Sequence, residues 1–324
     1  MSEARPEEPI IDPLLPICDG HHHLWTYAQN PWLPERFAEA TGGHRVLSSV
    51  HVECRHGWRD SGPDELRPVG ETEFVAACTA EPVNGIRIAA GIVAFADLRL
   101  GEAVEPVLDA HLAASERVRG LRYMTAWDAS EQVRNAQTEP PPGLLADPQF
   151  RAGLRCLITR GLSFDAWVYH PQIPEVTALA QALPELVIVL NHVGGPLGIG
   201  PYAGRRDEVF AAWQAAMREL ATCPNVCVKL GGLTMPLAGF GWHKRATPPD
   251  SEELADALGP WYRFCIETFG PQRCLFESNF PIDSTACSYV TLWNAFKRIT
   301  AGLSAEDRAA LFHDTAVRVY RLDA

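Results

Sequence analysis

The sequence is poor in basic residues and has no long hydrophobic run. Its 324 residues include 28 lysines and arginines against 40 aspartates and glutamates, which gives a formal net charge of −12. Nucleic-acid binders neutralise phosphates with a basic surface, so this balance argues against a nucleic-acid partner. No hydrophobic run approaches the roughly 20 residues of a membrane span, and residues 1–16 lack the features of a signal peptide. We therefore expect no membrane partner, a cytoplasmic location and a small-molecule substrate.

Several enzyme signatures are also missing. The sequence has no G-x-S-x-G motif of the kind that presents a nucleophilic serine, and no G-x-x-x-x-G-K-[ST] loop for nucleotide phosphates. The nine cysteines are odd in number and scattered, which is unlike a disulfide framework and suits a reducing compartment. These absences argue against a serine hydrolase, a P-loop enzyme and a disulfide-rich secreted protein.

What the chain does contain is an alternation of strand and helix patterns. Eight short segments are rich in β-branched and apolar residues, and between most of them apolar residues recur at helical spacings of three and four. This alternation predicts one (β/α)8 TIM barrel, an α/β fold, over residues 17–324, after an N-terminal extension over 1–16. The expected strands are Ile17–Trp25, Val46–Cys54, Gly91–Leu98, Val118–Thr125, Leu162–Tyr169, Leu186–Val193, Val226–Leu233 and Arg273–Phe280. The expected helices are Glu71–Thr79, Ala103–Ser115, Pro148–Arg160, Ile173–Ala182, Arg206–Thr222, Ser251–Phe269 and a closing helix within Ser304–Leu322.

Four long segments follow strands rather than helices. They cover residues 55–70, 126–146, 194–205 and 234–250 and are rich in Gly, Pro and polar residues. In a TIM barrel such segments are the βα loops of the C-terminal rim, where active sites lie. A doubly wound open sheet is the competing architecture, but it requires a glycine-rich turn after its first strand, where this chain has histidines.

Histidines mark the ends of two predicted strands. The first strand ends CDGHHHLW, and alternation along a strand places Asp19, His21 and His23 on one face. Two imidazoles at i and i+2 can bind a divalent metal from the same side, although exposed histidines at a strand end are the simpler alternative. His192 lies at the end of the sixth strand, shortly before Gly194 and Gly195. It is a candidate third metal ligand or an electrophile toward a carbonyl.

Five motifs in order give the chain a family resemblance. DGHHHLW, LRY, NHVGGP, VKLGGL and FESNFPID occur along nearly the whole chain, which resembles the amidohydrolase superfamily and, within it, the amidohydrolase-related lactonases that include fuconolactonases and pyrone-dicarboxylate lactonases. The resemblance implies a distorted barrel with its site at the C-terminal rim. It also implies hydrolysis of a cyclic ester by activated water, with a divalent metal such as zinc or manganese in some members. His21 and His23 match the family's first-strand pair, and His192 matches its later histidine.

The general base of the family has no direct counterpart here. The family's last-strand aspartate falls in the motif S-D-W-P, and this chain has Asn279 at that catalytic position. A neutral amide cannot accept a proton from water near pH 7, so Asn279 is not the base. Glu277, two residues earlier, and Asp283, two residues after the following proline, are the candidate replacements, with His192 assisting. Glu53, at the end of the second strand, is a further candidate metal ligand.

Cationic and aromatic residues at strand ends are candidate substrate contacts. Arg122 ends the fourth strand and Lys229 lies at the end of the seventh, and each is either paired internally or available for an acidic or hydroxylated substrate. Tyr169 and His170 close the fifth strand, and Trp127 follows the fourth, where aromatic rings can line a slot for a substrate ring.

Two other functions remain compatible with the same residues. Related barrels decarboxylate aromatic or unsaturated acids, which would make this chain a metal-dependent lyase. Loss of the aspartate at position 279 would also be compatible with a barrel that only binds a ligand. A homodimer is the expected assembly, because dimers are the commonest oligomers.

Overall fold

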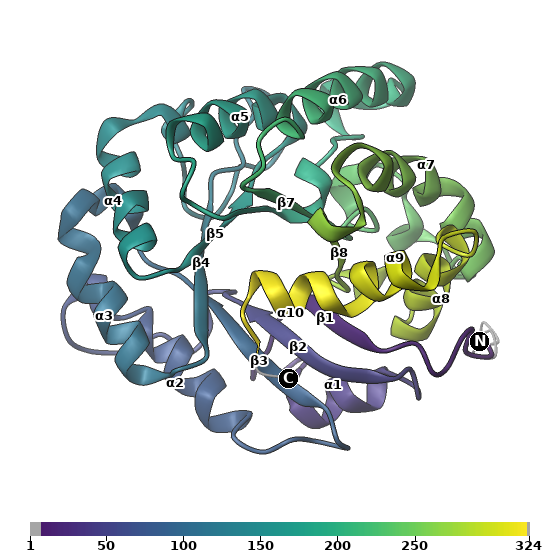
Figure 1. The fold of residues 1–324 in the computed structure, drawn as a ribbon, viewed down its shortest axis with the longest axis horizontal. Coiled ribbons are helices and arrows are strands. Elements are labelled where there is room, and N and C mark those ends of the chain that lie inside the picture. The colour runs from purple at the N-terminus through teal and green to yellow at the C-terminus, as the bar shows by residue number, and fades with distance from the viewer. Residues whose placement is uncertain (1–7, 323–324) are drawn as a thin grey trace.

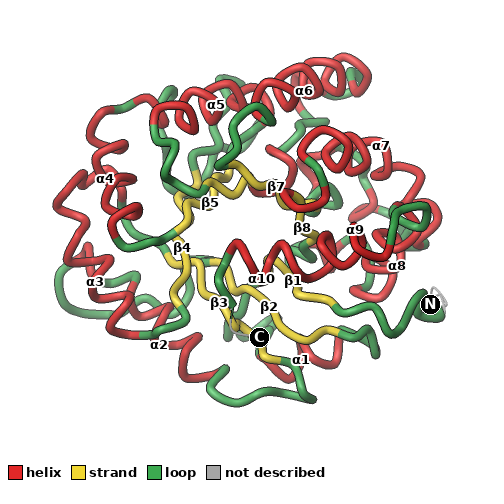
Figure 2. Tube along the Cα trace, viewed as in Figure 1, coloured by secondary structure: helices red, strands yellow, loops and turns green. Residues whose placement is uncertain are grey.

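The computed structural model describes residues 8–322, and its strands form one parallel sheet that curls into a barrel with helices on the outside (Figures 1 and 2). The strands pair in sequence order from first to last, and the segment after the eighth returns to the first: the His23 N–H donates to the Phe280 carbonyl at 2.8 Å. This architecture confirms the predicted (β/α)8 barrel. The strands are β1 (Ile17–His22), β2 (Val46–Val52), β3 (Arg87–Ala94), β4 (Val118–Met124), β5 (Ser163–Trp167), β6 (Ile188–Leu190), β7 (Val226–Leu230) and β8 (Cys274–Phe276).

Eight helices alternate with the strands. They are α1 (Pro34–Ala40), α2 (Val69–Cys78), α3 (Glu105–Ala114), α4 (Pro148–Thr159), α5 (Ile173–Ala182), α6 (Arg206–Leu220), α7 (Ser251–Phe269) and α8 (Tyr289–Ile299). Two of them, α1 and α8, were not predicted. The first is only seven residues long and begins with a proline, which is too short for a periodic pattern. In α8, ten of the eleven residues are buried, although its sequence is strongly amphipathic, so a helical pattern was present there and was overlooked.

Strands β6 and β8 are shorter than predicted. Each has three residues, because the chain leaves the sheet at Asn191 and at Glu277. The side chains that follow these two strands therefore stand on turns above the barrel mouth rather than on the strands themselves.

The last helical segment closes the opposite end of the barrel. It consists of α9 (Ala305–Ala309), a π-helical turn (Ala310–Asp314) and α10 (Thr315–Val319), and Figure 1 shows it crossing the barrel end in yellow. Its side chains complete a buried apolar layer inside the barrel. This layer contains Cys18, Val50, Val52, Val93, Val189, Cys227, Leu275, Ala316, Val319, Tyr320 and Leu322.

The described part of the N-terminal extension packs on α8. The Lys297 ammonium donates hydrogen bonds to the carbonyls of Ile11 and Asp12 at 2.7 and 3.0 Å, and the Ile11 N–H donates to Asn294 at 2.9 Å. Residues 1–7 of this predicted extension lie outside the described residues. Among the helices of residues 8–322, none is both long and apolar enough to cross a membrane.

Candidate active site

Polar side chains on four strands and on the turns after β6 and β8 meet inside the C-terminal mouth of the barrel. All of them are buried, although several carry charge. Such groups are stable in an interior only when they are paired. They are His21, Arg122, Asp165, His192, Lys229 and Glu277.

Glu277 joins the two histidines into what we call the central cluster: His21, His192 and Glu277. Its Oε1 accepts hydrogen bonds from His192 Nδ1 at 2.6 Å and from the His192 backbone N–H at 3.2 Å. Its Oε2 lies 2.8 Å from His21 Nδ1. The rings of His21 and His192 are 4.7 Å apart between centroids. Three residues that are distant in the sequence are therefore brought together around one carboxylate.

The backbone around His192 is shaped for this contact. His192 and Val193 both have left-handed backbones, with φ of 53° and 47°, and such strain costs about 1–3 kcal/mol for a residue like valine. Gly231 and Gly232 lie in the turn after β7. A Cβ atom added to Gly232 would lie 2.4 Å from His192 Nδ1, and one added to Gly231 would lie 2.3 Å from Glu277 Cγ. Both glycines are therefore needed for the central cluster to form.

On its other side, His21 faces His23. The His23 Nδ1–H donates to the Val52 carbonyl at 2.8 Å, so the neutral ring keeps a lone pair on Nε2. Burial lowers the pKa of both imidazoles well below the usual value, which favours that neutral form. His23 Nε2 lies 3.3 Å from His21 Nε2 and 3.3 Å from Asn279 Oδ1. The Asn279 amide group donates to Asp283 at 2.9 Å, which turns its oxygen toward His23.

This side of His21 fits a divalent metal. His23 Nε2 lies 3.3 Å from both His21 Nε2 and the Asn279 amide oxygen, so two ring nitrogens and an amide oxygen converge. Two nitrogens bound to tetrahedral zinc are about 3.3–3.4 Å apart, and the two Nε2 atoms are separated by 3.3 Å. The 2.6 Å contact between Glu277 Oε1 and His192 Nδ1 is instead a hydrogen bond, although His21, His192 and Glu277 also place possible ligand atoms within 4.8 Å of one another.

Both cations of the mouth have carboxylate partners. The Arg122 guanidinium donates to Glu53 Oε1 at 2.7 Å and also to the Glu53 carbonyl, and its Nη1 lies 3.3 Å from His21 Nε2. Lys229 Nζ donates to Asp165 at 2.7 Å and lies 3.4 Å from His21 Nδ1. Glu53 is thus engaged by Arg122, with which it forms a buried ion pair.

Asp165 and Tyr320 were not among the predicted site residues. Asp165 accepts hydrogen bonds from Lys229, from Asn191 at 2.9 Å and from the Tyr320 hydroxyl at 2.9 and 3.0 Å. An aspartate inside the apolar strand SFDAW is a signal that could have identified it. Tyr320 reaches this network from beyond α10, and nothing in the local sequence indicates that contact.

Asp283 lies behind Asn279. It is fully buried, and burial raises the pKa of its carboxyl to about 7. Its hydrogen bond to Asn279 holds a residue with a left-handed backbone, φ 55°. Asp283 therefore positions the amide that faces His23.

The predicted aromatic contacts lie on a neighbouring part of the rim. Tyr169 packs in an apolar cluster with Trp167 and Leu197, and His170 Nδ1 accepts from the Leu197 N–H at 3.3 Å. The Trp127 backbone N–H donates to a glutamine side chain at 2.9 Å. Trp167, which was not predicted, connects this cluster to the site, because its ring contacts that of His192 edge-on at 4.7 Å.

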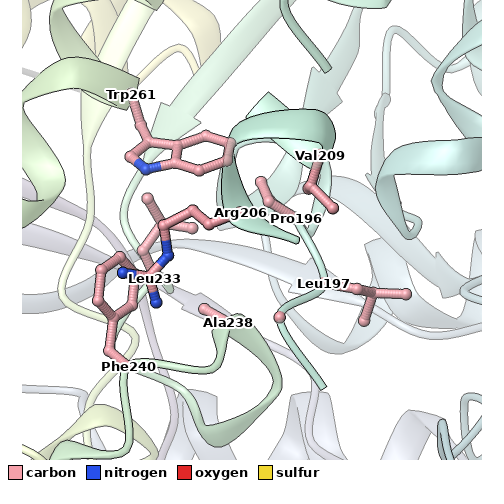
Figure 3. A pocket seen from close by; sticks show the side chains of 9 residues that line it. Pro196, Leu197, Arg206, Val209, Leu233, Ala238, Phe240 and Trp261 are labelled. Carbon is pink, nitrogen blue, oxygen red and sulfur yellow. The ribbon is translucent and has the colours of Figure 1, made fainter. Parts of the chain in front are cut away.

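Two long rim loops are tied to each other beside the site. The Gly198 N–H donates to the Leu237 carbonyl at 2.8 Å, and the Arg206 guanidinium lies 4.0 Å from the centre of the Phe240 ring. Figure 3 shows Arg206, Phe240 and Trp261 lining the small apolar pocket between these segments. The loops over 194–205 and 234–250 therefore form one continuous wall.

Comparisons with known proteins show relatives that match nearly the whole chain. A protein of Sinorhizobium fredii, the uncharacterized protein y4mH, is 32% identical, over 94% of this chain and 98% of its own. An L-fucono-1,5-lactonase of Burkholderia multivorans is 28% identical over 94% of this chain and 95% of its own. A solved amidohydrolase from Burkholderia multivorans with bound zinc has 26% identity and a TM-score of 0.74, over 95% of this chain and 99% of that one.

The family profile gives the same result over almost the full length. Residues 18–322 match the Amidohydrolase family. The match spans all eight strands and the whole mouth, which confirms the resemblance found in the sequence. The chain belongs to the amidohydrolase family.

Proposed function

We propose that the protein opens a small lactone by hydrolysis. The observation that carries this proposal is the Glu277 carboxylate, held between His192 and His21 at the mouth of an amidohydrolase barrel. The similarity to a fuconolactonase over nearly the whole chain supports a cyclic ester as the substrate.

In this proposal His192 takes the proton from the attacking water. Its Nδ1–H donates to Glu277 at 2.6 Å, so the neutral ring keeps its lone pair on Nε2 and can accept a proton there. The carboxylate orients the ring and stabilises the imidazolium that forms. Glu277, a candidate base in the sequence, then works through His192. Asp283 and Asn279 set the orientation of the His23 side of the site.

A divalent metal, zinc or manganese, fits the same mouth. His21 and His23 would hold it through Nε2, with the Asn279 oxygen beside them, whereas Glu53 would stay with Arg122. When bound, such a metal polarises a carbonyl and lowers the pKa of a water molecule. The solved relative with bound zinc supports this assignment.

The charges of the mouth favour a neutral substrate. Arg122 and Lys229 are each engaged by their own carboxylate, Glu53 and Asp165, and Glu277 adds a further acidic group. Among these residues a substrate carboxylate would therefore find no uncompensated cation, so the bound metal would be its only positive partner, and Glu277 would oppose that attraction. We propose a hydroxylated sugar lactone, with Tyr169, His170 and Trp127 contributing contacts from the rim.

A substrate panel tests the proposal. The purified protein is assayed with neutral five- and six-membered sugar lactones and with lactones that carry a carboxylate, before and after chelation, and products are identified by mass. We expect addition of water to neutral lactones, with kcat/KM at least about tenfold higher than for the charged ones (about 1.4 kcal/mol). Loss of CO₂ from an acid would instead establish a lyase, and no turnover of any lactone would contradict the proposal.

A further inference from the structure

A second group of metal-binding side chains lies on the outside of the barrel wall. It consists of His51 on β2, Cys54 just after β2 and Glu71 on α2, and we call it the outer cluster. Val50 and Val52 belong to the layer inside the barrel, so His51, between them, points to the opposite face. That face is covered by helices, with α2 on the outside of the barrel (Figure 1).

The donor atoms of the outer cluster converge on one carboxylate oxygen. Glu71 Oε1 lies 3.4 Å from His51 Nε2 and 3.3 Å from Cys54 Sγ. One donor atom from each of the three residues lies within 4.8 Å of the other two. Ligands of tetrahedral zinc are about 3.4 Å apart for a nitrogen and an oxygen, and about 3.5 Å apart when one of them is sulfur. The two distances to Glu71 Oε1 are close to these values.

Hydrogen bonding does not explain why the His51 imidazole is buried. Its side chain is fully buried, and neither ring nitrogen has a hydrogen-bond partner within residues 8–322. Its approach to Glu71 lacks hydrogen-bond geometry, although the distance is short. A buried imidazole without partners is costly, and a bound ion is one of the few arrangements that satisfies it.

We propose that His51, Cys54 and Glu71 bind a zinc ion at a site distinct from the central cluster. Imidazole nitrogen, thiolate sulfur and carboxylate oxygen are the three donor types that zinc accepts, and sulfur disfavours magnesium and calcium. Cys54 is half-buried as a residue, whereas His51 and Glu71 are buried. Binding converts the Cys54 thiol to a thiolate, and the proton that it loses passes to solvent.

A purely structural role for Glu71 is the competing explanation. Its Oε1 also accepts a hydrogen bond from the Cys54 backbone N–H at 2.7 Å, which fastens the turn after β2 to α2. That hydrogen bond explains why the Glu71 carboxylate is buried and why the Cys54 thiol lies beside it. It does not account for an imidazole that points at the same oxygen with both nitrogens unsatisfied.

Cobalt substitution distinguishes the two explanations, because the central cluster contains no sulfur. The full-length protein is stripped with a chelator and titrated with Co²⁺, and the near-ultraviolet thiolate-to-cobalt charge-transfer band is recorded. We expect a saturable band corresponding to one ion per chain. It should disappear in Cys54→Ser, remain in Cys78→Ser, another half-buried cysteine, on α2, and remain in Glu277→Gln.

Zinc content and thermal stability supply a second measurement. Wild-type protein equilibrated with Zn²⁺ and desalted should hold one more zinc per chain than Cys54→Ser, and Zn²⁺ should raise Tm more in the wild type. Circular dichroism checks that each variant is folded. A wild type with no charge-transfer band, or a band and zinc content that Cys54→Ser leaves unchanged, would overturn the proposal. Neither result depends on lactonase activity.

Discussion

The central and outer clusters contain similar residues in different surroundings. Each combines histidine with glutamate at the C-terminal end of the barrel. In the central cluster, Glu277 contacts two imidazoles, and Lys229 and Arg122 bring positive charge to His21. In the outer cluster, His51 has no hydrogen-bond partner among the described residues. The comparison teaches that similar side chains can be held by hydrogen bonds and ion pairs in one buried cluster and left with an unpartnered imidazole in another.

We expect the largest loss of stability where a buried ion pair of the barrel mouth is broken. Replacing Lys229 by Met leaves the buried Asp165 without its cation, which should lower the free energy of unfolding by about 3–5 kcal/mol. In metal-free protein, His51→Leu removes an imidazole that forms no hydrogen bond, and we expect a change of at most about 1 kcal/mol. Urea unfolding of both variants measures the difference, with Lys244→Met as an exposed control. Equal losses at the two positions would refute the contrast between the clusters.

The next effect concerns turnover at the central cluster. Glu277→Gln keeps the shape of the side chain but removes the charge that stabilises a His192 imidazolium, so kcat should fall by about 10²–10⁴-fold. Glu175→Gln, a partly buried glutamate on α5, is the matched control and should remain within a few-fold of wild type. Steady-state kinetics on the best lactone provides the measurement, with circular dichroism to verify the fold. Near-normal kcat in Glu277→Gln would remove Glu277 from the mechanism.

A smaller effect is expected at the far end of the central network. Tyr320→Phe removes a hydroxyl that donates to Asp165 at 2.9 and 3.0 Å, and hydrogen bonds to charged groups contribute about 1.5–3 kcal/mol. We expect a loss of about 2 kcal/mol in chemical denaturation. Tyr27→Phe, at a residue that is 48% exposed, should change stability by less than about 0.5 kcal/mol. A Tyr320→Phe protein as stable as wild type would show that the network ends at Asp165.

We expect the smallest effect on stability at a buried histidine outside both clusters, which serves as a reference. His111 is hydrogen-bonded through both nitrogens, and burial lowers its pKa to about 4. The unfolded chain therefore binds more protons below pH 6.5, and stability falls as pH drops from 6.5 toward 4. Between pH 7 and 5.5 this residue should contribute about 1 kcal/mol of that loss. Chelator-treated His111→Gln should show a shallower pH dependence than wild type, and identical slopes would disprove the assignment.

The barrel could be predicted from the sequence, and so could the convergence of residues near the ends of its strands. His21, His192 and Glu277 each lie at or beyond the midpoint of a predicted strand, and the carboxyl ends of parallel barrel strands share one rim. Their convergence therefore follows from topology alone. The ordered motifs also made the family visible, because they extend over most of the chain.

The side-chain pairs that form across the barrel could not be predicted from the sequence in the same way. Whether Arg122 faces a substrate or Glu53 depends on the register between β2 and β4 and on the rotamer of a long side chain. The contact between Tyr320 and Asp165 joins residues 155 positions apart, and no local pattern encodes it. Helix α8 is a different case, because its sequence is strongly amphipathic and the helix could have been predicted.

The segment that closes the barrel also has a consequence for synthesis of the chain. Residues 316–322 complete the apolar layer inside the barrel, and Tyr320 supports the Asp165 that holds Lys229. In a growing polypeptide, the contact between Tyr320 and Asp165 can form only after residue 320 has left the ribosome. Affinity tags are therefore better attached before residue 8 than directly after Leu322, which is buried against that layer.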